Sequence, residues 1–244
     1  MKFKIALYVL LLPITTYAQN LRVAVAANAQ YVSEALVKEF KKQTGVEVQL
    51  IVGASGKFTA QIQEGAPFDV FMSADMVYPQ RLYEKKLTVS APKVYACGTL
   101  VLWSTKLKQP LISSLTQQSI SKIAVANPKL APYGTATMQA LKQLNLLNAL
   151  QPKIVYGESI AQVNQYLLTG VADAAFTAKA VVMHGENKNK GSWTDVDSKL
   201  YKPIAQGVVI LKNADKQNMK YATMFYNFLF GSTAKHIFKA YGYK

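Results

Sequence analysis

The chain has 244 residues, of which 50% are hydrophobic and 17% are charged. This composition supplies enough apolar side chains for one large or two small domains and excludes a disordered chain. A single cysteine, Cys97, excludes an internal disulfide framework, and two histidines leave little for a histidine-based metal site. Lys and Arg number 28 against 13 Asp and Glu, and the resulting net charge of +15 favours anionic partners without naming one.

Residues 1–18 have the pattern of a secretory signal peptide. A lysine-containing start precedes an apolar run over 5–14, and the segment closes on the small residue Ala18. The run is shorter than the roughly 20 residues that cross a bilayer, which argues against a membrane anchor. We therefore expect cleavage after Ala18 and a soluble mature protein outside the cytoplasm.

The basic charge raises the question of a nucleic-acid partner. Lysines occur singly or in pairs along the chain, and Arg22 and Arg81 are its two arginines, so there is no arginine-rich run. The aromatic residues fall mainly at helical or strand spacing, which is typical of a core rather than of a base-stacking platform. We expect a solvated basic surface and no nucleic-acid partner.

The first part of the mature chain alternates strands with helices. We expect, in order, a strand over 21–26, a helix over 28–43, a strand over 46–52, a helix from the Gly53-Ala54-Ser55-Gly56 turn to Gly65, a strand over 69–72 and a helix over 78–85 capped by Asp75. This alternation predicts a mostly parallel sheet covered by helices.

A second α/β unit follows. We expect strands over 98–104, 123–126, 153–156, 172–176 and 204–211, helices over 132–144, 160–168 and 216–241, and a polar loop over 185–199. The sequence therefore predicts two α/β units in one chain.

Four turns share one pattern, in which a strand ends, one or two small or polar residues follow, and a helix begins. These turns are at Asn28, Ser55-Gly56, Pro132-Tyr133-Gly134 and Ser159-Ile160. A helix start presents unpaired backbone N–H groups and a partial positive charge, which suit an anion. A single turn of this kind is usually only a helix cap, but the carboxyl ends of the strands are where α/β proteins bind ligands.

The same turns lie within segments that carry a family resemblance. The segments are Val25-Ala26-Ala27-Asn28, Gly53-Ala54-Ser55-Gly56-Lys57, Gly65-Ala66-Pro67-Phe68-Asp69-Val70-Phe71-Met72-Ser73-Ala74-Asp75, Asn127-Pro128-Lys129-Leu130-Ala131-Pro132-Tyr133-Gly134 and Tyr241-Gly242-Tyr243. In this order, over the whole mature chain, they resemble the periplasmic molybdate-binding proteins of ABC importers.

The resemblance implies an α/β fold of the type II periplasmic-binding class. In that fold two lobes with mixed, mostly parallel sheets hold the ligand in the cleft between them. We expect one lobe to comprise residues 19–100 plus 206–244 and the other residues 101–205. The lobes would hinge near 98–102 and 203–207.

Carried over position by position, the family's ligand-binding turns fall on Asn28, Ser55, Tyr133 and Ile160. Ser55 would donate its hydroxyl and backbone N–H, and Ile160 its backbone N–H. Some members have Ser in place of Asn28, and some have a ligand Tyr where this chain has Ala178. We hypothesise that the Tyr133 hydroxyl replaces that missing tyrosine.

The chemistry of the ligand agrees with this set of residues. Molybdate is a tetrahedral dianion without a proton, so its site needs donors only, and uncharged donors avoid burying a cation as well. We expect Glu158 to cap its own helix, and Asp69 and Asp75 to fix local geometry. No cofactor and no direct metal-ion ligand is expected. Tungstate should bind as well, and sulfate is the alternative ligand.

An enzyme is a weaker reading of the same residues. Gly53-Ala54-Ser55-Gly56 is not the Gly-x-Ser-x-Gly elbow of a serine hydrolase. Gly56-Lys57 is not a phosphate-binding loop, because Ile51 stands at the position of its first glycine and Phe58 at that of its Ser or Thr. We therefore expect no catalysis, but a periplasmic monomer that captures the oxyanion by closure of the lobes and passes it to a membrane permease.

Overall fold

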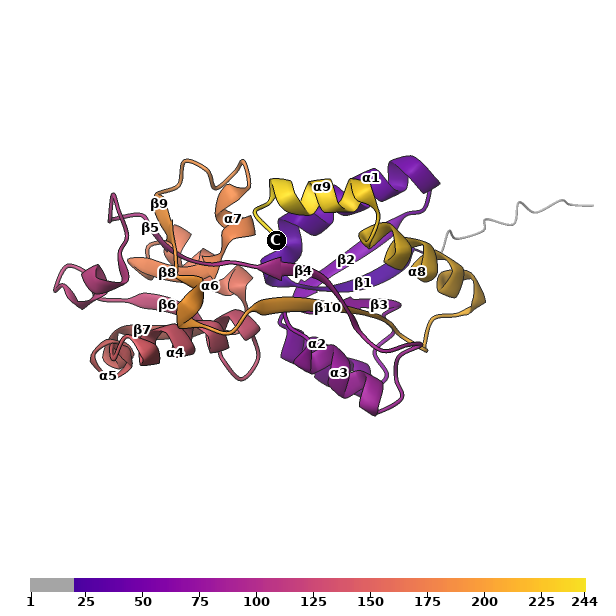
Figure 1. Cartoon of the computed structure of the whole chain (residues 1–244), viewed down its shortest axis with the longest axis horizontal. Coiled ribbons are helices and arrows are strands. Elements are labelled where there is room, and N and C mark those ends of the chain that lie inside the picture. The colour runs from indigo at the N-terminus through magenta and orange to yellow at the C-terminus, as the bar shows by residue number, and fades with distance from the viewer. Residues whose placement is uncertain (1–19) are drawn as a thin grey trace, which may run out of the picture.

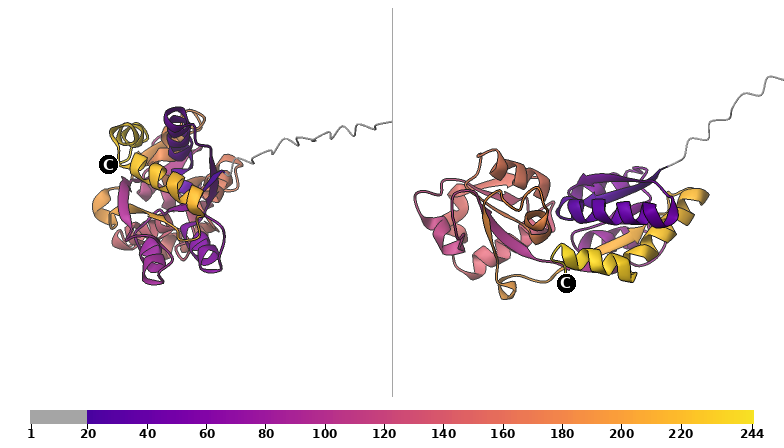
Figure 2. Two further views of the ribbon diagram at one scale, coloured as in Figure 1. Left: turned by 90° about the vertical axis from the view of Figure 1, so that its right-hand side faces the viewer. Right: turned by 90° about the horizontal axis from the view of Figure 1, so that it is seen from above.

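The computed structural model describes residues 20–244, which form two lobes, each built on a five-stranded sheet (Figure 1). The predicted signal peptide, residues 1–18, lies outside the described residues. The two lobes lie end to end, and the C-terminus lies close to their junction (Figure 2). Within residues 20–244, no helix combines the length and the apolar character that a membrane crossing requires.

The first sheet has the strand order β2-β1-β3-β10-β4. Its strands are β1 (Leu21–Ala26), β2 (Val48–Gly53), β3 (Val70–Met72), β4 (Lys93–Gly98) and β10 (Ile204–Ile210). Strand β1 is parallel to β2 and β3, whereas β10 is antiparallel to β3 and β4. The strand that returns from the second lobe is therefore built into the first sheet.

Helices cover both faces of this sheet. They are α1 (Gln30–Thr44), α8 (Lys216–Leu229) and α9 (Ser232–Ala240) on one face, and α2 (Ser55–Gln63) and α3 (Val77–Glu84) on the other. Neighbouring residues of β1 point to opposite faces, as the two-residue period of a strand requires. Val23 and Val25 pack with Phe40 and Phe225, whereas Ala24 packs with Phe58.

The second sheet repeats the arrangement of the first, with the order β7-β6-β8-β5-β9. Its strands are β5 (Leu100–Ser104), β6 (Ile123–Ala126), β7 (Ile154–Gly157), β8 (Ala174–Ala178) and β9 (Ser192–Asp195). Strand β6 is parallel to β7 and β8, and β5 is antiparallel to β8 and β9. The predicted two-lobed α/β fold with mixed sheets is confirmed. The sheets are not mostly parallel, because two of the four strand pairings in each sheet are antiparallel.

The second lobe buries one large core around Trp103 and Phe176. Its helices are α4 (Pro132–Gln143), α5 (Leu147–Leu150), α6 (Ile160–Leu168) and α7 (Lys179–Met183). Short 3₁₀ helices complete the described chain: η1 (Ala27–Ala29), η2 (Ile112–Thr116), η3 (Gln151–Lys153) and η4 (Ser198–Leu200).

Three predicted elements were wrong in detail. The strand expected over 98–104 is two strands in different sheets, β4 and β5, separated by Thr99. The loop expected over 185–199 contains β9. The helix expected over 216–241 is broken at Gly231, which precedes the first turn of α9. Both missed strands are sheet edges, whose exposed side weakens the apolar pattern that marks a strand.

Two segments join the sheets. The chain leaves the first sheet at Gly98, enters the second at Leu100, and returns between β9 and Ile204, the first residue of β10. Ile204 pairs with Gly98, so the two crossings run next to each other. A pair of adjacent crossings permits the lobes to turn relative to each other like a hinge.

Candidate functional site

A small cavity lies between the lobes and is lined from both. Its residues are Ala26, Ala27, Asn28, Gly53, Ala54, Ser55 and Ala74 of the first lobe and Ala131, Pro132, Tyr133, Ser159 and Ile160 of the second. The cavity volume is about 10 Å³, room for one small group and far less than the roughly 300 Å³ or more of a drug-sized ligand site. The structure thus brings together Asn28, Ser55, Tyr133 and Ile160.

Ser55 is the first residue of α2 and is 1% exposed. Its Oγ accepts a hydrogen bond from the backbone N–H of Ala74 at 3.0 Å. Because this bond uses a lone pair, the hydroxyl proton stays available for an acceptor in the cavity. The Ser55 N–H belongs to the first turn of α2, where helices leave backbone donors unpaired.

Asn28 lies in η1, directly after β1, and is 2% exposed. Its side chain donates from Nδ2 to Oε1 of Gln206 at 3.0 Å and faces the Tyr243 hydroxyl at 3.5 Å. Both amide hydrogens are therefore directed at protein groups, and the backbone N–H is the donor that Asn28 has left for a ligand.

The second lobe contributes two helix starts. Pro132 occupies the first position of α4 and has no N–H, so Tyr133 carries the first backbone donor of that helix. Ser159 caps α6 by accepting from the Gln162 N–H, and Ile160 is the first residue of the helix. Among residues 20–244, the backbone N–H groups of Tyr133 and Ile160 have no acceptor.

The Tyr133 hydroxyl has a partner that the sequence did not indicate. It accepts from Nε2 of Gln206 at 3.3 Å, next to the crossing of the chain at Gly98. Burial raises the pKa of Tyr133 and Tyr95 well above the usual value, so both hydroxyls keep their protons. That the Tyr133 hydroxyl contacts the ligand stays a prediction.

The cavity offers donors without charge. Its lining holds no charged side chain among the residues that the structure describes. Within the same part of the chain, no group of three or more His, Cys, Asp or Glu side chains is placed to hold a metal ion. The helix starts supply partial positive charge instead, which favours an anion over a cation or a neutral ligand.

The acidic residues singled out in the sequence have structural partners. The carboxylate of Asp69 accepts from the Arg22 N–H at 2.7 Å, and that of Asp75 accepts from the Tyr78 N–H at 3.2 Å, at the start of α3. Their expected geometric roles are confirmed. The expectation for Glu158 was wrong, because Ser159 caps α6 whereas the Glu158 carboxylate pairs with Lys57 of the opposite lobe.

The lobes touch around the cavity. The Gly56 N–H donates to the Leu130 carbonyl at 2.9 Å, and the Tyr78 hydroxyl donates to the Lys129 carbonyl at 2.9 Å. The Lys57–Glu158 ion pair is a third contact between the lobes, and it joins α2 to the segment just before α6. These bonds need both lobes in place, so the described arrangement is the closed one.

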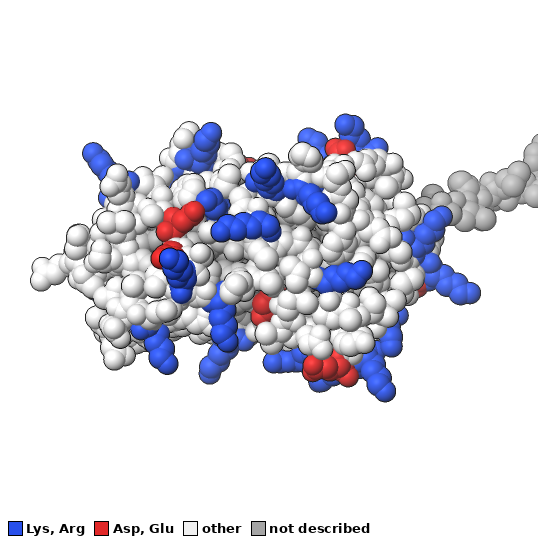
Figure 3. Space-filling model, in the orientation of Figure 1, with Lys and Arg blue, Asp and Glu red and all other residues white. Residues whose placement is uncertain are grey.

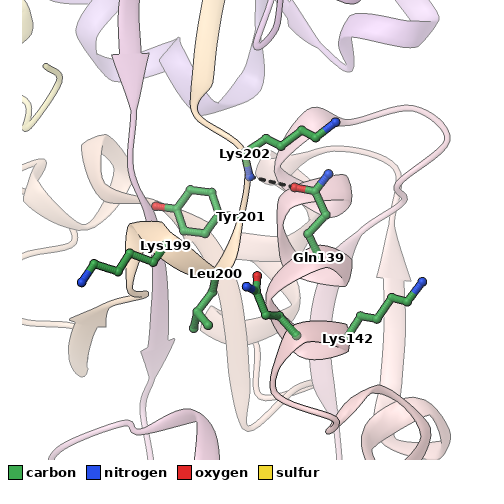
Figure 4. Close-up of a pocket in the computed structure, with 7 residues that line it drawn as sticks. Gln139, Lys142, Lys199, Leu200, Tyr201 and Lys202 are labelled. Atoms are coloured by element: carbon green, nitrogen blue, oxygen red, sulfur yellow. Dashed lines mark hydrogen bonds between the residues drawn. The ribbon is translucent and has the colours of Figure 1, made fainter.

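A larger hollow lies beside the chain crossing, with a volume of about 550 Å³. It is lined by Gln139, Lys142, Gln143, Lys199, Leu200, Tyr201 and Lys202 (Figure 4). Its three lysine side chains point away from one another and do not meet at one point. This hollow therefore lacks the convergent donors of the cavity between the lobes.

Comparisons with known proteins agree with the fold. The family described as bacterial extracellular solute-binding protein matches residues 21–244. The molybdate-binding protein ModA of Azotobacter vinelandii is 39% identical over 236 residues, 96% of this chain and 93% of that protein. ModA of Rhodobacter capsulatus is 36% identical over 222 residues, 90% and 86% of the two chains. The solved structure of the A. vinelandii periplasmic molybdate-binding protein superposes with a TM-score of 0.87 at 36% identity, covering 92% of this chain and 99% of that one.

Proposed function

Because the chain belongs to the bacterial extracellular solute-binding proteins, a family of transport components, we propose that it captures molybdate and delivers it to an ABC importer. The observation that carries this proposal is the uncharged cavity into which four strand-to-helix turns converge from two lobes. The names of the two relatives that are more than 35% identical support molybdate as the ligand. Tungstate, a dianion of the same shape, belongs to the same proposal.

In this proposal the ligand residues are Asn28, Ser55, Tyr133 and Ile160. Each contributes a backbone N–H from a helix start, and Ser55 adds its hydroxyl. Hydrogen bonds to a charged acceptor are about twice as strong as those between neutral groups, so a few donors can replace the hydration of a dianion. The function needs the oxyanion as ligand and no cofactor, direct metal-ion ligand or catalytic residue.

Capture proceeds by closure of the lobes. We assign the lobes to residues 19–100 plus 206–244 and to residues 101–205, with boundaries that differ from those of the sheets by up to two residues, because Leu100 begins a strand of the second sheet and Ile204 begins a strand of the first. Turns from the first lobe carry Asn28 and Ser55, and helix starts from the second carry Tyr133 and Ile160. An anion that contacts both sets binds the closed state better than the open state, and this difference shifts the population toward closure. The closed form is then the one that a permease reads.

The protein acts in the periplasm as a monomer without a nucleic-acid partner. The signal-peptide pattern with cleavage after Ala18 supports export. Figure 3 supports a solvated basic surface, because on the face shown Lys and Arg side chains stand singly or in small groups among uncharged atoms.

Thermal unfolding tests the ligand. The mature protein, stripped of bound anions, is heated with molybdate, tungstate, sulfate or phosphate at equal concentration. A ligand present at 1,000 times its Kd adds about 4 kcal/mol to the free energy of unfolding. We expect molybdate and tungstate to raise the midpoint strongly and phosphate to leave it unchanged. An equal shift with sulfate would make the cavity a general site for tetrahedral anions, and no shift with any anion would overturn the proposal.

A further inference from the structure

A cluster of buried polar side chains lies between the cavity and the chain crossings. We name it the Gln206 cluster, after its central residue, and it comprises Asn28, Tyr95, Tyr133, Gln206 and Tyr243. Oε1 of Gln206 accepts from Asn28 Nδ2 at 3.0 Å and from the Tyr95 hydroxyl at 2.7 Å. Nε2 of Gln206 donates to the Tyr133 hydroxyl at 3.3 Å. Gln206 itself is fully buried.

Gln206 is out of place in an ordinary strand core. It lies in β10, between residues whose side chains are mostly buried and apolar, at a bulge against β4. A buried amide costs free energy unless its oxygen and nitrogen both find partners. In Gln206 both atoms have partners. The oxygen accepts from Asn28 and the nitrogen donates to Tyr133, and both of these residues line the cavity.

The cluster joins the two lobes. Asn28, Tyr95 and Tyr243 belong to the first lobe together with Gln206, whereas Tyr133 is the second residue of α4 in the second lobe. The Gln206–Tyr133 bond therefore forms across the lobes, beside the chain crossing at Gly98. Tyr243 is held in the cluster by donating its hydroxyl to the Asn28 carbonyl at 3.3 Å.

Gly98 leaves the room that this bond needs. A Cβ atom built on Gly98 would lie 2.1 Å from the Tyr133 hydroxyl oxygen and 2.5 Å from Gln206 Nε2. Any other residue at position 98 would push the two groups apart. The Gln206–Tyr133 bond therefore depends on a glycine at position 98.

We propose that Gln206 is a positioning residue that couples the two halves of the ligand site, because its amide orients Asn28 and engages Tyr133 when the lobes close. The inference rests on the proposed function, since it concerns how tightly the closed lobes retain molybdate. Gln206 lies outside the cavity lining, so its effect on the ligand passes through Asn28 and Tyr133.

The test measures the rate of molybdate release from the mature protein by rapid mixing. Gln206→Met keeps the length of the side chain and removes both hydrogen-bonding ends. We expect release about tenfold faster, the change that follows from losing one buried hydrogen bond made only in the closed state. Ser104→Ala is the matched control, because it removes a fully buried hydroxyl that donates to the Asp173 carbonyl inside the second lobe. Its release rate should equal that of the native protein.

A double-mutant cycle separates coupling from general damage to the fold. We expect Tyr133→Phe to speed release about tenfold in the native background but by less than about twofold in Gln206→Met, because the bond that it removes is already absent. If Gln206→Met does not fold, the cycle of Tyr95→Phe with Tyr133→Phe tests the same coupling, since these hydroxyls meet through Gln206.

Two results would overturn the inference. One is an unchanged release rate in Gln206→Met. The other is an equal effect of Tyr133→Phe in both backgrounds, which would mean that the hydroxyl acts on the anion directly. Either result leaves the proposed function standing if the native chain binds molybdate. A native chain without molybdate binding overturns the proposed function and this inference together.

Discussion

Gly56 is a position where the backbone of the second lobe closely approaches the first lobe, and it tests the closure mechanism. It is the second residue of α2, and its N–H donates to the Leu130 carbonyl of the other lobe at 2.9 Å. A Cβ atom at this position would lie 3.1 Å from both Cα and O of Leu130 and 2.9 Å from the Tyr78 hydroxyl. In Gly56→Ala, backbone of the opposite lobe must therefore move away.

The substitution has opposite effects on the open and closed states. In the helix, Ala is favoured over Gly by up to about 1 kcal/mol, so the ligand-free protein should unfold at the same or a higher temperature. In the closed state, overpacking against a backbone costs about 1–3 kcal/mol. Movement of Tyr78 would also weaken its bond to the Lys129 carbonyl, a second contact between the lobes. We expect the Kd for molybdate to rise about 10- to 100-fold.

Calorimetric titration with molybdate and thermal unfolding without ligand measure the two effects separately. Gly185→Ala is the matched control, because a Cβ atom at Gly185 meets nothing within 4 Å. Its Kd should equal that of the native protein. An unchanged Kd in Gly56→Ala would show that closure does not depend on this contact. A higher Kd accompanied by an equal loss of stability in the ligand-free protein would contradict an effect confined to the closed state.

Two further predictions concern single side chains. Ser55→Ala removes the hydroxyl donor of the cavity and should raise the Kd for molybdate about 10- to 100-fold in the same titration, whereas Ser33→Ala, which removes a buried hydroxyl in α1, should leave it unchanged. Burial opposes ionisation of Asp173, but hydrogen bonds from Lys106 and from Ser121 and Lys122 outweigh it and lower its pKa to about 2. This folded-state pKa is below the usual value of 3.8. The carboxylate therefore stabilises the fold fully above pH 3.8, and this contribution is lost as the pH falls from 3.8 toward 2. Asp173→Asn should cost about 2 kcal/mol in urea unfolding at pH 7 and much less near pH 2; an equal cost at both pH values would contradict the assignment.

Much of the fold could be predicted because its central strands are short, buried apolar runs and its helices have apolar residues at helical spacing. Leu21–Ala26, for example, is a short strand that is apolar except for Arg22 and ends two residues before Asn28. The edge strands β4 and β9 could not be predicted in the same way, since Lys93–Gly98 begins with exposed residues and Ser192–Asp195 is only partly buried. The break between α8 and α9 at Gly231 shows how a single glycine ends a helix whose apolar spacing continues on both sides.

The site was predictable as a set of turns but not as a network. Four strand-to-helix turns with small or polar residues marked Asn28, Ser55, Tyr133 and Ile160, and the structure places all four around one cavity. The role of Gln206 could not be read from the sequence, because a glutamine within an apolar run carries no information about which side chains it meets. Its partners lie 178, 111 and 73 residues away along the chain. The folded chain brings these residues to Gln206. The one local signal in the sequence was a glutamine inside a predicted core strand.

A crystal structure of the mature protein grown with molybdate would test the proposed ligand site most directly, because the anomalous signal locates the molybdenum. We expect one strong peak in the cavity between the lobes, with anion oxygens about 2.7–3.2 Å from the backbone nitrogens of Ser55, Tyr133 and Ile160. A peak among Lys142, Lys199 and Lys202 with an empty cavity would contradict it, because the anion would then be held by surface charge rather than by the convergent helix starts.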